Sequence, residues 1–251
     1  MTAEEKTALH DFLNLASAYL RIGYMQPIED TPEDDASRAS LPLAYTTEEP
    51  EDSLEYLAAQ VNICRACGLA SARKNTVPGE GAEHPLVMVI GEGPGADEDA
   101  AGRPFVGRAG QLLDRMLSSI GLSRDKNCFI ANMVKCRPPG NRDPAPDEME
   151  ACFPYLERQI ILLRPLLILC AGRIASQKLL KTREGINALR GEFAELKIGG
   201  ETIPVLPTFH PSALLRDETN KRPAWEDLKL LRTRLASMNE EYAASLEKSD
   251  A

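Results

Sequence analysis

Short apolar runs alternate with amphipathic stretches through most of this sequence. The apolar runs, rich in Leu, Ile, Val and Met, predict buried strands at residues 86–90, 128–134, 166–170 and 203–206. Apolar positions at helical spacing predict helices at residues 110–120, 146–163, 174–180 and 224–238. Strands that alternate with helices are typical of a parallel sheet covered by helices on both faces. The pattern therefore predicts an α/β fold.

Polar and glycine-rich motifs follow each of the predicted strands. GEGPGADED begins at Gly91 after the first strand, and Asn132 lies near the end of the second. Residues 171–173 follow the third strand, and the sequence TFHPS at residues 208–212 follows the fourth. Because ligands in such sheets bind at the carboxyl ends of the strands, we expect one site where these four segments meet.

The two ends of the chain differ from its centre. Residues 3–21 have an apolar stripe at helical spacing, and an acidic, proline-bearing stretch follows them. We therefore expect an accessory amphipathic helix at residues 1–25, an acidic flexible linker at 26–52, a main domain at 53–238 and an acidic C-terminal tail at 239–251. Docking of residues 3–21 on the main domain and docking on a protein partner both stay open.

The net charge of -9 is unevenly distributed. Residues 1–60 carry 3 basic and 13 acidic side chains, and residues 239–251 carry one basic and four acidic ones, which leaves residues 61–238 with a charge of +4. The main domain can therefore bind anions, although so small a charge is weak evidence for nucleic acid. The sequence shows no transmembrane window and no secretory signal, so we expect a cytoplasmic protein that does not bind a membrane. We also expect a monomer.

Four of the six cysteines have a pattern that suggests a metal site. Cys64 and Cys67 are separated by two residues, and Cys136 and Cys152 lie far along the chain. Such a set could join distant segments through zinc or an iron-sulfur cluster, and spacing alone does not decide between them. Thiols of a cytoplasmic protein stay reduced, which argues against disulfides. The other two cysteines lie in apolar runs and are expected in the core.

The glycine-rich turn partly fits a dinucleotide-binding pattern. Gly91, Gly93 and Ala96 stand at the required spacing after a strand. However, acidic residues 97–99 occupy the place where a pyrophosphate would bind, and no acidic residue closes a second strand about twenty positions later. A tight turn that directs Glu92 and backbone amides into a pocket is the better interpretation.

Three further residues have side chains suited to holding a planar polar ligand. Phe105 lies on a glycine-flanked loop and offers a stacking face. Asn132, in an apolar strand, needs partners for its amide. His210 follows the last strand, where a histidine on its own is more often structural than catalytic.

Taken together, GEGPGADED, GRPFVGRAGQLLD, NMVKCRPPGNRDP, FHPSALLR and the four cysteines resemble the family 4 uracil-DNA glycosylases. The resemblance covers about residues 64–238. It implies a three-layer α/β/α fold with a central four-stranded parallel sheet. It also implies a structural [4Fe-4S] cluster on Cys64, Cys67, Cys136 and Cys152, and excision of uracil from single- and double-stranded DNA.

The resemblance also implies roles for individual residues. Phe105 would stack on a flipped uracil, Asn132 would read its edge, and His210 would donate a hydrogen bond to O2. Glu92, Gly93 and Pro94 would bind the substrate on its sugar and water side. That Glu92 activates the water is a hypothesis, with Glu98 and Asp99 as competitors. The segment after His210 would contact DNA through Ser212, Leu214, Leu215 and Arg216, with the leucines as an apolar wedge.

Two alternatives remain at this point. One is a relative that captures uracil-containing DNA covalently, but its histidine-bearing insertion is absent from KCRPPGNRDP. The other is a non-catalytic iron-sulfur module that binds nucleic acid, for which Phe105, Asn132 and His210 would not be needed together.

Overall fold

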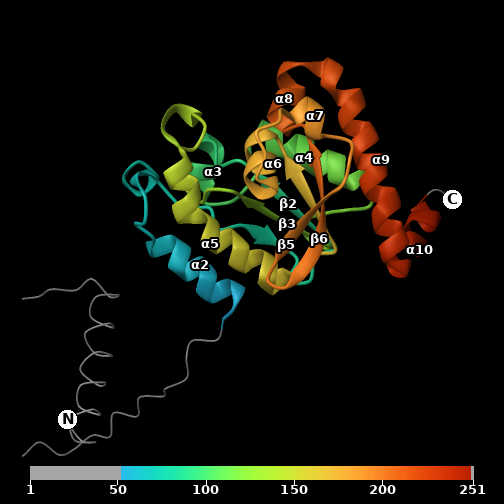
Figure 1. Ribbon diagram of the computed structural model, residues 1–251, viewed down its shortest axis with the longest axis horizontal. Helices are drawn as coiled ribbons and strands as arrows, with labels where there is room; N and C mark the ends of the chain where they lie inside the picture. The colour runs from blue at the N-terminus through green and yellow to red at the C-terminus, as the bar shows by residue number, and fades with distance from the viewer. Residues whose placement is uncertain (1–51, 250–251) are drawn as a thin grey trace, which may run out of the picture. The chain divides into compact units, whose positions relative to one another are not determined.

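The computed structural model describes residues 52–249, in which six strands form one sheet (Figure 1). The strands are β1 (Glu80–Gly81), β2 (Val87–Gly91), β3 (Cys128–Asn132), β4 (Leu167–Ala171), β5 (Ala194–Ile198) and β6 (Glu201–Thr208). Their order in the sheet is β1-β3-β2-β4-β6-β5. Strands β3, β2, β4 and β6 are parallel, and they correspond to the four strands predicted from the apolar runs.

The helices of the described residues cover both faces of this sheet. They are α2 (Leu54–Ile63), α3 (Ala96–Ala101), α4 (Arg108–Ser118), α5 (Pro146–Leu163), α6 (Arg173–Leu180), α7 (Ile186–Leu189), α8 (Pro211–Arg216), α9 (Lys221–Met238) and α10 (Glu240–Ser249). Short 3₁₀ turns lie at Gly68–Ser71, Pro139–Asn141 and Glu218–Asn220. The predicted helices correspond to α4, α5, α6 and α9.

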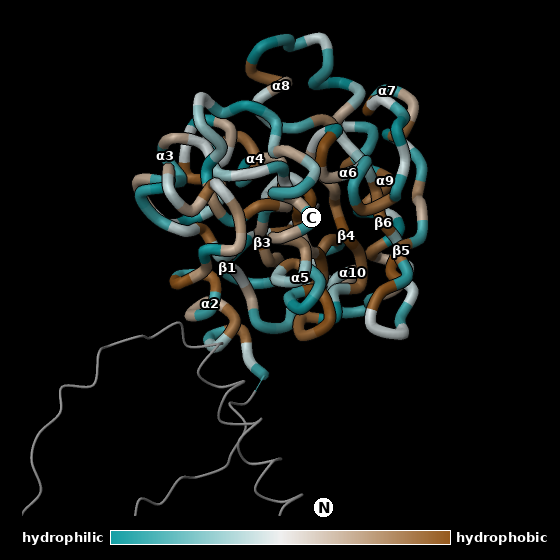
Figure 2. Tube along the Cα trace, turned by 60° about the vertical axis from the view of Figure 1, so that its left-hand side comes forward, coloured by the Kyte–Doolittle hydropathy of each residue, from teal (hydrophilic) through white to brown (hydrophobic). Residues whose placement is uncertain are grey.

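Two apolar cores hold the three layers together. Val87 and Val89 of β2 pack with buried side chains of α4, α9 and α10 on one face. Met88 and Ile90, which alternate with them, pack with side chains of α5 and α6 on the other. Successive strand residues point to opposite faces, so a strand buried on both sides is apolar throughout. Figure 2 shows hydrophobic strand segments inside more hydrophilic surface loops.

The prediction of a four-stranded parallel sheet is correct for the centre but wrong for the edges. β1 pairs antiparallel with β3, and β5 pairs antiparallel with β6, so the sheet has six strands and is mixed. β1 contains only two residues, one of them Gly81. β5 alternates exposed and buried side chains and therefore contains no continuous apolar run. Neither edge strand has the apolar pattern that identified the central ones.

The C-terminal segment forms part of the folded structure. Residues 239–251, expected as an acidic tail, contain α10, which packs against α9. Tyr242 is buried in the same core as α4 and donates a hydrogen bond to the Ile120 carbonyl. The packed core therefore extends beyond residue 238.

The expected accessory helix at residues 1–25, and all but the last residue of the linker at 26–52, lie outside the described residues. Within residues 52–249, no helix is long and apolar enough to cross a membrane.

Candidate active site

A cavity of about 540 Å³ lies at the carboxyl ends of the parallel strands, where the sequence motifs predicted a site. The strand pairing sets Gly91 beside Asn132 and Ala171 beside Thr208, so the segments that follow the strands meet at one edge of the sheet. Eight of the predicted site residues line the cavity: Glu92, Gly93, Pro94, Phe105, Asn132, His210, Ser212 and Arg216.

Asn132 ends β3 with its side-chain oxygen unsatisfied. The residue is 1 % exposed, and its Oδ1 atom accepts no hydrogen bond from any group in residues 52–249. A Cβ atom at Gly91 would lie 2.4 Å from this oxygen and 2.6 Å from the Phe105 ring, so only glycine fits between them. Buried polar atoms normally have partners. An orphan acceptor in a cavity wall is therefore suited to a ligand N–H group.

Phe105 and His210 meet in the same wall. Their ring centroids are 5.5 Å apart, with the planes tilted by 31°. Phe105 has a left-handed backbone, with φ of 51°, although it is not a glycine. The residue is buried rather than exposed on a mobile loop. The aromatic face is therefore part of a built pocket.

The contacts of His210 fix its protonation. Its Nδ1 atom accepts a 3.2 Å hydrogen bond from the Ser212 backbone N–H, and Ser212 Oγ lies 2.8 Å from the same nitrogen. Burial, assisted by the charge of Arg216 and opposed by Glu98, lowers the pKa of His210 to about 4. The ring is therefore neutral at pH 7, and its proton lies on Nε2, which can act as a donor. Ser212, which was predicted to contact DNA, orients the His210 ring through these contacts with Nδ1.

Like Glu98, the acidic residue Glu92 of the turn lines the cavity. Burial raises its pKa, the nearby Asp143 raises it further, and Arg173 and Arg216 oppose the rise. A raised pKa makes a carboxylate a better proton acceptor.

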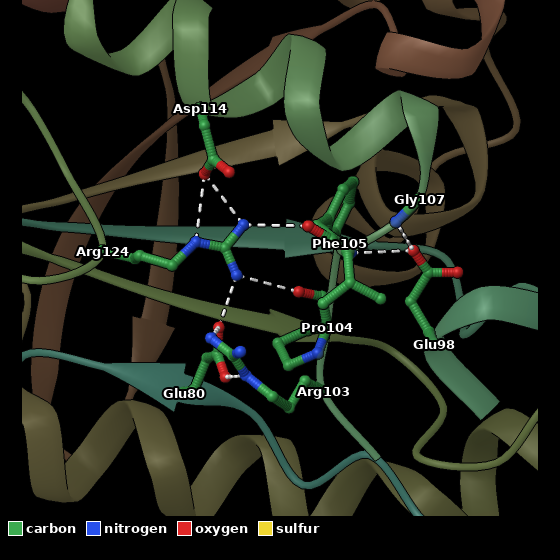
Figure 3. A network of polar contacts seen from close by, with 9 residues as sticks. Glu80, Glu98, Arg103, Pro104, Phe105, Gly107, Asp114 and Arg124 are labelled. Atoms are coloured by element: carbon green, nitrogen blue, oxygen red, sulfur yellow. Dashed lines mark hydrogen bonds and ion pairs between the residues drawn. The ribbon is translucent and has the colours of Figure 1, made fainter. Parts of the chain in front are cut away.

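The two competitors, Glu98 and Asp99, are used in backbone contacts. Glu98 accepts hydrogen bonds from the amides of Gly95, Val106 and Gly107. Figure 3 shows the bond from the Gly107 amide. Asp99 is buried and accepts a hydrogen bond from the amide of Lys74 at 2.9 Å. These contacts leave Glu92 as the better candidate base. They also occupy the Gly95 amide, which a bound pyrophosphate would need.

The segment after His210 corrects one prediction. Leu214 is 2 % exposed and packs with Phe209 and Ala224, so it belongs to the core and is not a free wedge. Leu215 is 36 % exposed. Neighbouring residues on a helix point about 100° apart, so only one of two adjacent leucines faces outward.

The four predicted cysteine ligands line one small cavity between α2, the loop after β3, and α5. Hydrogen bonds reach three of the sulfurs. Arg73 Nη1 donates to Cys136 at 3.2 Å, the Lys135 amide to Cys152 at 3.2 Å, and the Ala66 amide to Cys64 at 3.5 Å. Within residues 52–249, no group of three or more His, Cys, Asp or Glu side chains is placed to hold a single metal ion. Four thiols around one space suit a cluster wider than one ion.

Lys135 lies inside the protein, and no sequence pattern predicted this position. It is 1 % exposed, and its Nζ atom donates to the Asn132 carbonyl at 3.0 Å and to Gln159 Oε1 at 2.6 Å. Gln159 in turn donates to the Pro78 carbonyl. Lys135 thus connects the cysteine cavity with the end of β3. A lysine beside a cysteine gives no sequence signal of this role.

A buried ion pair was also missed. Asp227 of α9 is fully buried and accepts from Arg190 at 2.5 Å and from Thr208 Oγ1 at 2.7 Å. Arg190 also lies over the Phe209 ring, 5.4 Å from its centroid. The pair fixes the end of β6 just before His210. The partners are 37 residues apart, so no local pattern could reveal it.

Comparisons with known proteins identify the family to which the chain belongs. The family model described as "Uracil DNA glycosylase superfamily" matches residues 78–229. The type-4 uracil-DNA glycosylase of Saccharolobus solfataricus is 46 % identical over 191 residues, which cover 74 % of this chain and 88 % of that protein. The type-4 uracil-DNA glycosylase of Thermotoga maritima is 42 % identical over 181 residues, which cover 71 % of this chain and 92 % of that protein.

A type-5 uracil-DNA glycosylase of Mycobacterium leprae is more distant, with 30 % identity over 200 residues, 64 % of this chain and 85 % of that protein. The family model covers more than half of the 251-residue chain. Identity to the type-4 proteins is higher and extends over most of their length. The chain belongs to the uracil-DNA glycosylase superfamily and, within it, to the type-4 uracil-DNA glycosylases.

Proposed function

We propose that this protein is a DNA repair enzyme that hydrolyses the N-glycosidic bond of uracil in DNA, releasing free uracil and leaving an abasic site. The observation that carries the proposal is the unpartnered Oδ1 atom of Asn132 in the cavity wall. Uracil presents an N3–H donor next to the O4 acceptor, which match the oxygen and the NH₂ group of one amide. Cytosine presents an acceptor at N3 and a donor at C4, so it would leave buried groups unpaired.

A flipped nucleotide is needed because a duplex hides the glycosidic bond. The uracil would enter the cavity against Phe105. Leu215, exposed at the end of α8, would take the space left in the duplex, and Arg216 would contact a phosphate. Leu214 has no part in this, because it is buried.

Bond cleavage would follow from the charges at the site. As the C1′–N1 bond breaks, its electron pair leaves with uracil, and negative charge collects at N1 and O2. The neutral His210 ring would donate its Nε2–H to O2. Water would add to C1′ while Glu92 takes its proton. The products are a hydroxyl at C1′ and the uracil anion. Glu92 returns its proton to solvent, and the uracil anion takes up a proton from solvent on release, which gives free uracil and restores the site.

We infer further that Cys64, Cys67, Cys136 and Cys152 hold a [4Fe-4S] cluster. The donor set of four thiols, the cavity they share and the N–H groups directed at the sulfurs support it. When bound, the cluster would supply a structural link between distant segments. None of the proposed hydrolytic steps passes through it.

The substitution Cys136→Ser tests the cluster. We expect the wild-type protein to be brown with broad visible absorption, and the variant to lose colour and folded yield, because one ligand of the link is gone. Absorption spectra and iron analysis measure this. Cys170→Ala is the matched control, since Cys170 is buried in β4 away from the cavity and should keep the colour. A colourless wild-type protein with stoichiometric zinc would contradict the cluster.

Analysis of the reaction products distinguishes the proposed glycosylase from the two alternatives, a relative that captures uracil-containing DNA covalently and a non-catalytic iron-sulfur module. Single- and double-stranded DNA containing one uracil should yield free uracil and an abasic site without added metal or nucleotide. A covalent complex of protein and DNA would indicate the capturing relative instead. Tight binding without release of uracil would indicate the non-catalytic module. Equally fast removal of thymine would contradict a uracil-specific enzyme, and equally fast removal of cytosine would refute the proposed role of Asn132.

A further inference from the structure

Phe105 is held in a conformation that its own chemistry disfavours. A φ of 51° is costly for any residue with a Cβ atom, and it lasts only where the surroundings hold it. The same conformation directs the ring toward His210. The groups that hold the Phe105 backbone therefore also control where its ring lies.

One set of contacts comes from Glu98 of α3. Its Oε1 atom accepts hydrogen bonds from the amides of Val106 and Gly107, each at 2.9 Å. Its Oε2 atom accepts from the Gly95 amide at 3.1 Å. The carboxylate thus joins the glycine-rich turn to the two peptide units that follow Phe105 (Figure 3).

The second set comes from Arg124 on the other side of the same loop. Its Nη1 atom donates to the Pro104 carbonyl at 3.0 Å, and its Nη2 atom donates to the Phe105 carbonyl at 2.9 Å. Asp114 and Glu80 pair with the guanidinium and fix its orientation. Figure 3 shows the guanidinium between these two carboxylates, directed at both carbonyls.

We propose that Glu98 and Arg124 form a clamp that sets the Phe105 ring in place before the base arrives. Both are positioning residues, acting through Phe105 and not on the reacting atoms. This inference rests on the proposed function and deepens it. Glu98 was one of the two competitors of Glu92 for the role of general base. The clamp gives it a different role, because the three hydrogen bonds that it accepts all come from backbone amides.

A double-mutant cycle tests the clamp in the full-length protein. Glu98→Ala should lower kcat/KM on uracil-containing single-stranded DNA by about tenfold. Without the clamp, the free-energy cost of the left-handed Phe105 backbone is no longer offset, and a cost of that size corresponds to about this factor in rate. In a Phe105→Ala background the same change should cost less than about twofold, because no ring remains to be placed. Glu83→Ala, which removes an exposed carboxylate outside the cavity and the clamp, is the control and should leave both backgrounds unchanged.

The conservative variant separates positioning from proton transfer. Glu98→Gln keeps an oxygen for the amides of Val106 and Gly107 and should therefore retain more activity than Glu98→Ala. A general base would lose equally in both variants. Arg124→Met should show the same dependence on Phe105, with the exposed Arg115 of α4 as its control. Circular dichroism checks that each variant folds.

These experiments distinguish a failure of the clamp from a failure of the proposed function. If the wild-type protein releases uracil but Glu98→Ala costs as much in the Phe105→Ala background as alone, the clamp is refuted and the proposed function stands. Equal losses of activity in Glu98→Gln and Glu98→Ala would refute it as well. If the wild-type protein releases no uracil, the proposed function itself fails, and the clamp fails with it.

Discussion

Replacing Asn132 with aspartate is expected to lower the rate of uracil release by roughly 100-fold or more. The change removes the NH₂ donor and places a carboxylate in a position that is 1 % exposed. The new charge would face a leaving group that is itself becoming anionic, so the transition state loses more than the ground state. Single-turnover rates with enzyme in excess measure the effect on the chemical step.

Asn239→Asp is a suitable control for this substitution. Asn239 Oδ1 accepts a 2.8 Å hydrogen bond from the Tyr242 amide at the start of α10, and aspartate can accept the same bond. The control makes the same change of charge outside the cavity and should keep the wild-type rate. Equal activity of Asn132→Asp and the wild type on uracil would mean that this amide does not read the base.

The central sheet was predictable because its strands are buried on both faces. Such strands must be apolar at every position, as at Val87 to Ile90, and this leaves an unmistakable run in the sequence. The edge strands are exposed on one side, so their signal is weaker. A better prediction of β5 was available, because the pair Gly199 and Gly200 between two alternating segments is typical of a hairpin turn.

The predicted site residues could be found because they stand in motifs that directly follow the apolar strands and that resemble those of a known family. Their partners could not, since these come from distant parts of the chain. Glu98 illustrates the limit. An acidic residue in the first turn of a helix is equally compatible with a catalytic base and with an acceptor for backbone amides. Only the folded position of the Phe105 loop distinguishes the two.

The cysteine set could be predicted as a group from its sequence spacing and the resemblance, but the link to the base pocket could not. Lys135 contacts the Asn132 carbonyl with its side chain and Cys152 with its amide. Its position therefore connects the proposed cluster with the proposed reading residue through one buried side chain. A lysine that is buried so completely is unexpected from composition, because charged side chains are rarely buried without partners.

His210 gives the second large expected effect. His210→Leu should lower the rate of uracil release by on the order of 100- to 1000-fold, the usual effect of removing one donor to a developing oxyanion. The control is His84→Leu, because His84 is exposed and lies outside the cavity. Rates within tenfold of the wild type for His210→Leu would contradict the role of this ring as the donor to O2.

The protonation of His210 can be measured independently of activity. Burial, assisted by Arg216, holds its pKa at about 4, below the ordinary value of 6.5. As the pH falls, His210 therefore binds a proton at a higher pH in the unfolded chain than in the folded protein. The part of the folding free energy that depends on a neutral His210 is present above pH 6.5 and is lost as the pH falls toward 4.

Two measurements test this protonation state. Nitrogen NMR should show a neutral ring with its proton on Nε2 from pH 5 to pH 8. His210→Leu should flatten the pH dependence of the free energy of unfolding between pH 6.5 and pH 4. A ring that titrates near 6.5 would mean that His210 is charged during part of the working range, and the neutral-donor mechanism would have to be abandoned.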